Sequence, residues 1–295
     1  MNFDCIIIGG GPAGLSAAYY ILRANLSALI FSKGGGALEK AREVENYFGF
    51  AEPISGKALL DAGKANAVRL GGVWSDGEVV SLSPAEDGGF TVSDGNNAHG
   101  AKAVLLATGK PAQKAPYGLD SYIGRGVSRC AVCDGFFFRG KTVGVLGSGA
   151  YALAEAQELA HLAASVTIFT DGKKPEFAAP GNIKVVAEKP LGMTASVPPG
   201  ASEKKFDGFM LESGEKLPLD GLFVALGTPG ASDFAAKLGV ETNSGAIAAN
   251  EKGATNVPGL FAAGDCAGAP YQVSVAVGRG AAAGLAMVEY VRGLK

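Results

Sequence analysis

One glycine-rich pattern occurs twice in the chain, and it constrains the fold more than any other feature. Segments Phe3–Phe31 and Lys141–Thr170 each contain a short apolar strand, a glycine-rich turn, a helix of small residues and a second apolar strand. Each segment therefore predicts a β-α-β unit. Two such units, in a chain of 295 residues, predict an α/β protein with two Rossmann-like dinucleotide-binding domains.

The spacing of the small residues in both turns suits a pyrophosphate. In a G-x-G-x-x-G turn the first glycine permits the bend, the second lets the backbone approach the pyrophosphate, and the third lets helix and strand pack closely. The helix N-terminus then offers N–H groups to the phosphates. Two purely structural turns are the alternative. The expected contacts are Gly9, Gly11, Pro12, Ala13 and Gly14 in the first turn, and Gly147, Gly149, Ala150, Tyr151 and Ala152 in the second.

The remaining segments suggest how these units are completed. Apolar runs at 103–109, 221–227 and 259–265 each run into glycine and predict further strands. Residues 72–94 carry turn signals, as a small antiparallel meander would. The tail from Tyr271 to Leu294 is small, apolar and free of proline, so it predicts a packed helix.

Charge and hydropathy argue against nucleic acid and membrane partners. The net charge is −2, with 26 basic and 28 acidic residues, and no run of Lys or Arg is long enough to follow a phosphate backbone. No apolar stretch approaches the roughly 20 residues that span a bilayer. The N-terminal "CIIIGG" breaks into glycines too early for a signal peptide. We therefore expect a cytoplasmic protein.

Two closely spaced cysteines lie in "CAVCD" at residues 130–134. A Cys-x-x-Cys pair can bind a metal, staple a fold or carry electrons as a dithiol. A zinc site needs four ligands, yet Cys5, Cys266, His99 and His161 form no second pair in the sequence. Structural disulfides are rare in a reducing compartment. These points disfavour the metal and staple uses, but the spacing alone does not choose among the three.

Five segments carry a resemblance to a known family. They are "GGGPAG" at 9–14, "EVENYFGF" at 43–50, "ATG" at 107–109, "GRGVSRCAVCDGFFFRGKTVGVLGSG" at 124–149 and "GLFAAGD" at 259–265. Over nearly its full length the chain resembles the bacterial low-molecular-weight thioredoxin reductases, which are two-dinucleotide flavoproteins. The resemblance implies a discontinuous FAD domain, residues 1–113 and 242–295, an inserted nicotinamide domain, residues 114–241, and a homodimer.

The resemblance also implies FAD contacts beyond the first turn. Asp265 would hydrogen-bond the ribityl chain, Asn46 would contact the isoalloxazine ring, and the helix that starts near Gln272 would direct its positive end at the flavin pyrimidine. Ala37 and Tyr271 replace the glutamine and arginine that are usual in the family, which removes two polar contacts near the flavin. The other expected FAD contacts are Ser32, Gly35, Gly36, Ala107, Thr108, Gly109, Gly264 and Val273.

The electron donor is the point at which the chain departs most from the family. The arginine-rich NADPH signature of the family falls on Thr170, Asp171, Gly172 and Glu176. A carboxylate there would repel a 2′-phosphate and accept a hydrogen bond from a free 2′-hydroxyl, so we expect Thr170 and Asp171 in a site that prefers NADH. Lys173 and Lys174 argue the other way, since cations could bind phosphate. Ferredoxin or another flavin as donor is the alternative.

The resemblance finally assigns roles to the cysteines. The pair Cys130–Cys133 would be a redox disulfide, in which Cys133 faces the flavin and Cys130 attacks the disulfide of a thioredoxin-like protein. Asp134 would transfer the proton that this exchange requires. The implied activity is thioredoxin-disulfide reduction, with electrons passing from NADH through FAD and the dithiol. A ferredoxin- or flavin-dependent reductase and a small-molecule dithiol oxidase are alternatives.

Overall fold

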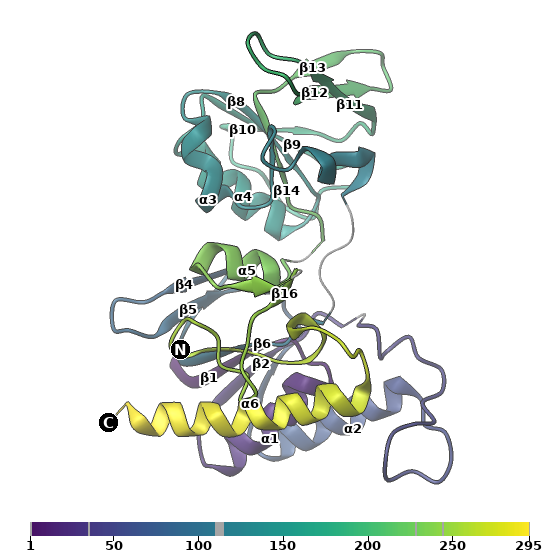
Figure 1. The fold of residues 1–295 in the computed structure, drawn as a ribbon, viewed down its shortest axis with the longest axis vertical. Helices are drawn as coiled ribbons and strands as arrows, with labels where there is room; N and C mark the ends of the chain where they lie inside the picture. The colour runs from purple at the N-terminus through teal and green to yellow at the C-terminus, as the bar shows by residue number, and fades with distance from the viewer. Residues whose placement is uncertain (1, 35, 110–114, 228, 244, 295) are drawn as a thin grey trace. The chain divides into compact units, whose positions relative to one another are not determined.

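The computed structural model describes residues 2–34, 36–109, 115–227, 229–243 and 245–294. The chain forms two compact units (Figure 1). The first consists of Met1–Ala112 and Gly230–Lys295, and the second of Gln113–Pro229. The structure thus places residues 230–241 with the first unit, whereas the sequence-based division places them with the second. The reason is helix α5 (Ala231–Leu238), whose buried Ala231, Phe234 and Ala235 belong to an apolar cluster of the first unit.

The sheet of the first unit is mostly parallel. Its described strands follow the order β3-β2-β1-β6-β5-β4, and β17 also pairs with β6. Strand β1 pairs in parallel with β2 and β6, while β4, β5 and the start of β6 pair antiparallel. The strands are β1 (Asn2–Ile8), β2 (Ala28–Phe31), β3 (Val73–Ser75), β4 (Ser81–Pro84), β5 (Phe90–Ser93), β6 (Ala98–Leu106) and β17 (Leu260–Ala262).

Helices cover both faces of this sheet. Helices α1 (Pro12–Arg23), α2 (Gly56–Arg69) and α6 (Val273–Gly293) lie together on one face, and α5 lies on the other (Figure 1). Small residues set the closest contact: a Cβ atom at Gly280 would lie 2.1 Å from the carbonyl oxygen of Ala13, and one at Gly284 would lie 2.6 Å from that of Ala17. Glycines one helical turn apart on α6 therefore let α1 pack against it.

The second unit repeats the parallel arrangement. Its five-stranded parallel sheet has the order β10-β9-β8-β14-β7, and a separate antiparallel sheet has the order β11-β12-β13. Helices α3 (Ala131–Asp134) and α4 (Ala150–Ala160) pack against each other. The strands are β7 (Val127–Ser128), β8 (Thr142–Leu146), β9 (Ser165–Phe169), β10 (Ile183–Val186), β11 (Pro190–Ser196), β12 (Lys205–Leu211), β13 (Lys216–Pro218) and β14 (Gly221–Val224).

Short elements complete the chain. They are the 3-10 segments η1 (Pro116–Tyr122), η2 (Gly135–Phe138) and η3 (Gly264–Ala267), and the paired strands β15 (Thr242–Asn243) and β16 (Ala246–Ile247). Among the described residues, no helix has both the length and the apolar character of a membrane span.

The structure confirms most of the element predictions. Both β-α-β units form, the predicted strand at 103–109 overlaps the end of β6, and those at 221–227 and 259–265 contain β14 and β17. The predicted tail helix is α6. The meander prediction for 72–94 is wrong for β3, which pairs in parallel with β2, while β4 and β5 do form an antiparallel pair. Strand β3 pairs with β2, which lies on the other side of α2 in the sequence, and local turn signals do not reveal such a distant partner.

Candidate functional site

The first glycine-rich turn connects β1 to α1 with the close approaches that its sequence predicts. Gly9 has φ of +121°, and a Cβ atom there would lie 2.1 Å from the carbonyl oxygen of Ala107. A Cβ atom at Gly14 would lie 1.9 Å from the carbonyl oxygen of Gly9. Gly11 is the N-cap of α1, and no described atom lies within 4 Å of a Cβ built there. The start of α1 is therefore open for a phosphate.

Two segments from elsewhere in the first unit lie close to this turn. Ser32, just after β2, lies against the turn, since a Cβ atom at Gly10 would come 2.6 Å from the Cβ of Ser32. Gly264, with φ of +80°, brings the segment before α6 against Ala13, where a Cβ atom would lie 3.0 Å from the Cβ of Ala13. Half-buried Asp265 follows directly. The open helix N-terminus, Ser32 and Asp265 fit an FAD whose pyrophosphate approaches the turn.

The structure brings two further predicted FAD residues together. The side-chain Nδ2 of Asn46 donates to Oε1 of Gln272 across 3.1 Å, although they lie 226 positions apart. Gln272 is the N-cap of α6, which Val273 begins. Thr108 has a structural contact, since its Oγ1 accepts a hydrogen bond from the N–H of Ala231 at 2.9 Å. A Cβ atom built at Gly36 or at Gly109 would meet no described atom beyond its chain neighbours within 4 Å, so neither glycine is required by packing. Gly35 lies outside the described residues.

The second turn has the same backbone plan. A Cβ atom at Gly147 would lie 2.1 Å from the carbonyl oxygen of Ala225 and 2.8 Å from the Cβ of Ala152. Gly149 is the N-cap of α4. The side chain of Tyr151 points into the core, where it is fully buried, so only its backbone faces the turn. Ala150 is the first residue of α4. This geometry also admits a pyrophosphate.

Acidic residues distinguish the surroundings of the second turn. The N–H of Glu176 donates to the carbonyl oxygen of Ser148 at 2.9 Å, and its Oε2 lies 3.7 Å from a Cβ built at Gly149. The carboxylate of Asp171 accepts a hydrogen bond from the hydroxyl of Tyr117. Because burial and this carboxylate both disfavour the phenolate, the pKa of Tyr117 is raised above its ordinary value. The strand end and the glycine-rich turn of the second unit therefore each carry a nearby carboxylate, Asp171 and Glu176.

The side chain of Thr170 does not lie at the surface of this site. It is fully buried, and its Oγ1 donates to the carbonyl oxygen of Lys173 at 2.5 Å, which closes the turn after β9. Lys173 and Lys174 are exposed. Thr170 and Asp171 are the two nucleotide contacts predicted after this strand, and only the side chain of Asp171 lies outside the core.

The two cysteines of "CAVCD" form a disulfide with a Cα–Cα distance of 5.3 Å. Cys130 is 5% exposed, whereas Cys133 is exposed at the surface. Cys130 is the N-cap of α3, and its Sγ accepts the N–H of Cys133 at 3.1 Å. This contact favours negative charge on the sulfur of Cys130 once the disulfide is reduced.

Two buried side chains hold the loop of this disulfide. Ser128, 3% exposed, accepts the N–H of Cys130 at 3.0 Å and donates from its hydroxyl to Oδ2 of Asp134 at 2.6 Å. Glu155 on α4, 1% exposed, accepts the N–H of Ala131 at 2.8 Å. Asp134 is therefore fixed beside the disulfide as an acceptor of a hydrogen bond.

The other two cysteines are placed in the core of the first unit. Burial raises the pKa of Cys5 to about 12 and that of Cys266 to about 11. Both thiols therefore stay protonated and unreactive near neutral pH. In the part of the chain that the structure describes, no group of three or more His, Cys, Asp or Glu side chains could hold a metal ion.

Comparisons with known proteins agree with this geometry. The family model described as pyridine nucleotide-disulphide oxidoreductase matches residues 3–280. The chain belongs to this family. A thioredoxin reductase from Streptomyces clavuligerus is 36% identical over 306 residues, which cover 99% of this chain and 94% of that protein.

Two solved structures are similar over nearly their whole length. The atypical thioredoxin reductase TRi from Desulfovibrio vulgaris Hildenborough has 37% identity and a TM-score of 0.89, covering 99% of this chain and 98% of that one. A ferredoxin-flavin thioredoxin reductase from Clostridium acetobutylicum has 32% identity and a TM-score of 0.72, covering 99% of both chains. The predicted resemblance and the predicted fold with two dinucleotide-binding domains are confirmed.

Membership of the pyridine nucleotide-disulphide oxidoreductases implies FAD and a pyridine nucleotide as cofactors. The sequence predictions missed Ser128, Glu155 and Tyr117. Ser128 lies two residues before the first cysteine, inside the most specific motif, and that proximity could have marked it. Glu155 is an acid in an otherwise small and apolar stretch of a helix, which is a weak signal of a buried partner. Tyr117 carries no sequence signal.

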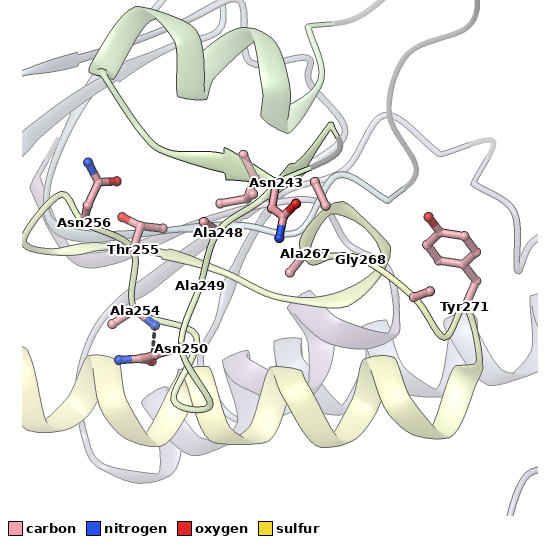
Figure 2. A pocket seen from close by; sticks show the side chains of 13 residues that line it. Asn243, Ala248, Ala249, Asn250, Ala254, Thr255, Asn256, Ala267, Gly268 and Tyr271 are labelled. Atoms are coloured by element: carbon pink, nitrogen blue, oxygen red, sulfur yellow. Dashed lines mark hydrogen bonds between the residues drawn. The ribbon is translucent and has the colours of Figure 1, made fainter.

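A groove of about 800 Å³ lies elsewhere in the first unit (Figure 2). Its lining includes Ala248, Asn243 and Asn250. The side-chain Oδ1 of Asn250 accepts a hydrogen bond from the backbone N–H of Ala254 at 3.0 Å. None of the predicted cofactor or catalytic residues lines it. Tyr271, which directly precedes the N-cap Gln272 of α6, does line it, so one end of the groove lies next to the start of that helix.

Proposed function

We propose that the protein is an FAD-dependent thioredoxin-disulfide reductase, with electrons passing from NADH to FAD, to the Cys130–Cys133 pair and to the disulfide of a thioredoxin-like protein. The observation that carries this proposal is the disulfide itself, held by buried Ser128 and Glu155 beside Asp134. Relatives named thioredoxin reductase match 99% of the chain and more than nine tenths of their own length.

The two cofactors are assigned to the two units. The first unit would hold FAD through the glycine-rich turn of β1 and α1, with Ser32, Asn46, Asp265 and Gln272 around it. The second would hold the nucleotide at the turn of β8 and α4. When bound, FAD accepts a hydride equivalent from a nicotinamide and supplies two electrons to a disulfide. The chain contributes the binding turns, the cysteines and the proton carrier.

The exchange with the partner uses both cysteines. In the reduced protein, the Cys130 thiolate attacks one sulfur of the partner disulfide, forms a mixed disulfide and releases a partner thiolate, which takes up a proton. The Cys133 thiolate then attacks Sγ of Cys130, breaks the mixed disulfide, re-forms the internal disulfide and releases the second partner sulfur as a thiolate, which also takes up a proton. Two electrons and two protons pass to the partner.

The exposures of the two sulfurs bear on this assignment. In the disulfide form Cys133 is exposed and Cys130 is buried. Attack by Cys130 therefore requires the loop to open after reduction. The N–H of Cys133, which Sγ of Cys130 accepts, would stabilise the attacking thiolate before that opening.

Asp134 would carry the proton for this exchange. Its Oδ2 accepts the hydroxyl hydrogen of Ser128, which fixes the carboxylate near the cysteines. From that position Asp134 would take a proton from the attacking thiol and return one to the leaving thiolate. Ser128 serves as its positioning residue.

The donor is assigned as NADH rather than NADPH, because Asp171 and Glu176 replace cations at the second site. One observation favours a second candidate: the Glu176 carboxylate lies at the N-terminus of α4, where it would repel any pyrophosphate. A donor without a pyrophosphate, such as ferredoxin or a reduced flavin, is therefore the alternative. The likeness to the Clostridium acetobutylicum structure points in the same direction.

By likeness to the same relatives we also assign the protein to the cytoplasm and to a homodimeric state. Sedimentation of the FAD-loaded protein tests the second point. A single species with the mass of one 29.7 kDa chain would contradict it.

Single-cysteine variants test the disulfide chemistry. Cys130→Ser should abolish reduction of thioredoxin while NADH still bleaches the flavin, and Cys133→Ser should trap a mixed disulfide through Cys130 that mass spectrometry detects. Cys5→Ala is the matched control, since that buried thiol is far from ionising. Trapping through Cys133 in the Cys130→Ser variant would reverse the two roles, and retained reductase activity in both variants would refute the proposal.

A further inference from the structure

One hydrogen bond joins two residues of unusual backbone conformation in the second unit. Among the described residues, three non-glycine residues have left-handed φ values: Asn25, Tyr117 at 60° and Asp171 at 56°. This region is unfavourable for residues with a side chain, so its occupation needs a local cause. The Tyr117 hydroxyl donates to Oδ1 of Asp171, 54 positions along the chain.

The turn after β9 explains the conformation of Asp171. Asp171 and Gly172 both have positive φ, at 56° and 76°, and the N–H of Lys173 donates to the carbonyl oxygen of Thr170 at 3.1 Å. Two successive positive φ values with this bond are the features of a type I′ turn, for which Asp-Gly is a preferred pair. Asp171 therefore stands at the tip of a tight turn that buried Thr170 anchors.

The position of this turn in the β-α-β unit indicates what the Asp171 carboxylate can bind. Strand β9 is the second strand of a β-α-β unit, and Asp171 follows its carboxyl end. In dinucleotide-binding units an acid at this place accepts a hydrogen bond from the 2′-hydroxyl of the adenosine ribose. Asp171 is thus in place to contact the ribose of a nucleotide whose pyrophosphate lies at Gly149.

Tyr117 approaches this carboxylate from a different segment and is itself held. Its ring packs edge-on against Phe209 of β12, with centroids 5.9 Å apart, and Phe209 packs against Phe169 at the end of β9 at 5.1 Å. This aromatic chain ties η1 to the strand end. The hydroxyl is a neutral donor, so it fixes one carboxylate oxygen without cancelling the negative charge, as a lysine or arginine would.

We propose that Tyr117 is a positioning residue that holds the Asp171 carboxylate for the 2′-hydroxyl of a non-phosphorylated adenine dinucleotide, so that the pair sets the selectivity for NADH over NADPH. This inference rests on the proposed function, because it requires the second unit to bind a nicotinamide nucleotide. A carboxylate that is already ordered loses less freedom when the ribose binds. Its retained charge opposes a 2′-phosphate.

Calorimetric binding of NAD⁺ and NADP⁺ to the oxidised, FAD-loaded protein tests this role without turnover. Tyr117→Phe should weaken NAD⁺ binding by about tenfold, the scale of one hydrogen bond to a charged group, and leave NADP⁺ binding no weaker, so that the selectivity ratio falls. Tyr122→Phe, in the same short segment η1, is the matched control and should bind NAD⁺ as the wild type does.

The other outcomes separate the inference from the function beneath it. If the wild type binds NAD⁺ and Tyr117→Phe binds it equally well or more tightly, Tyr117 holds nothing that the nucleotide needs, and the inference fails alone. If the wild type binds neither nucleotide but still reduces thioredoxin after chemical reduction of its flavin, the NADH assignment fails and the inference fails with it. Equal melting temperatures of both variants would exclude a folding defect as the cause of weaker binding.

Discussion

The two glycine-rich turns of this protein share a backbone and differ in their surroundings. At Gly9 and at Gly147 a Cβ atom would meet a carbonyl oxygen of the neighbouring strand end at the same distance, 2.1 Å. In both units the helix then begins at a glycine N-cap in an extended conformation. The part of each turn that would receive a pyrophosphate is therefore built alike.

The side chains at the strand ends are not alike. The first turn has the hydroxyl of Ser32 at the end of its second strand, whereas the second has the carboxylate of Asp171 there and that of Glu176 at the helix start. We therefore propose that the backbone motif provides a dinucleotide-binding turn in both units and that a few side chains beyond it determine which nucleotide is accepted.

The largest effect is expected from a methyl group in the turns themselves. Gly9→Ala combines a clash with the Ala107 carbonyl and a positive φ, so it should destabilise the first unit by roughly 3 kcal/mol or more and yield protein without flavin. Gly147→Ala should leave the flavin bound but abolish NAD⁺ binding. Gly11→Ala, where the space is open, should keep a stability near that of the wild type.

Flavin absorbance of the purified variants and their unfolding by denaturant provide the two readouts. A colourless Gly147→Ala protein, together with a yellow Gly9→Ala protein, would reverse the assignment of cofactors to units.

A change of charge at the second strand end should have the next largest effect. Asp171→Arg replaces the ribose acceptor by a cation that can pair with a phosphate, so kcat/KM for NADH should fall by about 10- to 100-fold while that for NADPH rises. Lys174→Ala is the control for general charge near this turn and should change the ratio little. An unchanged ratio in Asp171→Arg would show that the strand end does not contact the nucleotide.

The helices that follow the two turns differ at equivalent positions. Ala17 lies three residues after Gly14 and packs against Gly284 of α6, whereas Glu155 lies three residues after Ala152 and accepts the N–H of Ala131 in the redox loop. The same position of the helix therefore contacts helix α6 in the first unit, through Ala17, and the disulfide loop in the second unit, through Glu155.

Loss of this carboxylate should loosen the redox loop. Glu155→Ala leaves the buried N–H of Ala131 without its acceptor and should destabilise the second unit by about 1–3 kcal/mol, with Glu155→Gln losing less. Hydrogen exchange at Ala131 and denaturant unfolding measure both effects. Exposed Glu158 on the same helix provides the control variant Glu158→Ala, for which exchange should not change. Unchanged protection in Glu155→Ala would contradict a role in holding the loop.

The smallest effect is expected at Glu176, whose carboxylate is exposed and therefore screened. Glu176→Gln should tighten binding of NAD⁺ and NADP⁺ by about two- to fourfold each, and the gain should shrink as the ionic strength rises. Titrations at low and high salt measure it. Weaker binding of both nucleotides would show that Glu176 assists the site instead of opposing the phosphates.

The predictable part of this site is local in sequence. The turns at Gly9 and Gly147 could be predicted because three small residues and two flanking elements lie within one segment. The disulfide, Asn46 and Gln272 came from motif resemblance. The pairing of Asn46 with Gln272 across 226 positions could not be predicted from spacing.

The residues that escaped prediction depend on packing between distant segments. Tyr117 reaches Asp171 only because the aromatic contacts through Phe209 bring η1 to the end of β9. The N–H that Glu155 accepts belongs to a loop 24 positions earlier. Strand β3 pairs in parallel with β2 because a helix separates them, a relation that local turn signals cannot express.

Anaerobic titration of the FAD-loaded protein with NADH and with NADPH, followed by oxidised thioredoxin, tests the central claim most directly. We expect NADH to remove the yellow flavin absorbance at concentrations at which NADPH leaves it largely intact, and thioredoxin to restore it. Bleaching by NADPH at lower concentrations than NADH, bleaching by neither nucleotide, or a reduced protein that thioredoxin fails to reoxidise would contradict the account.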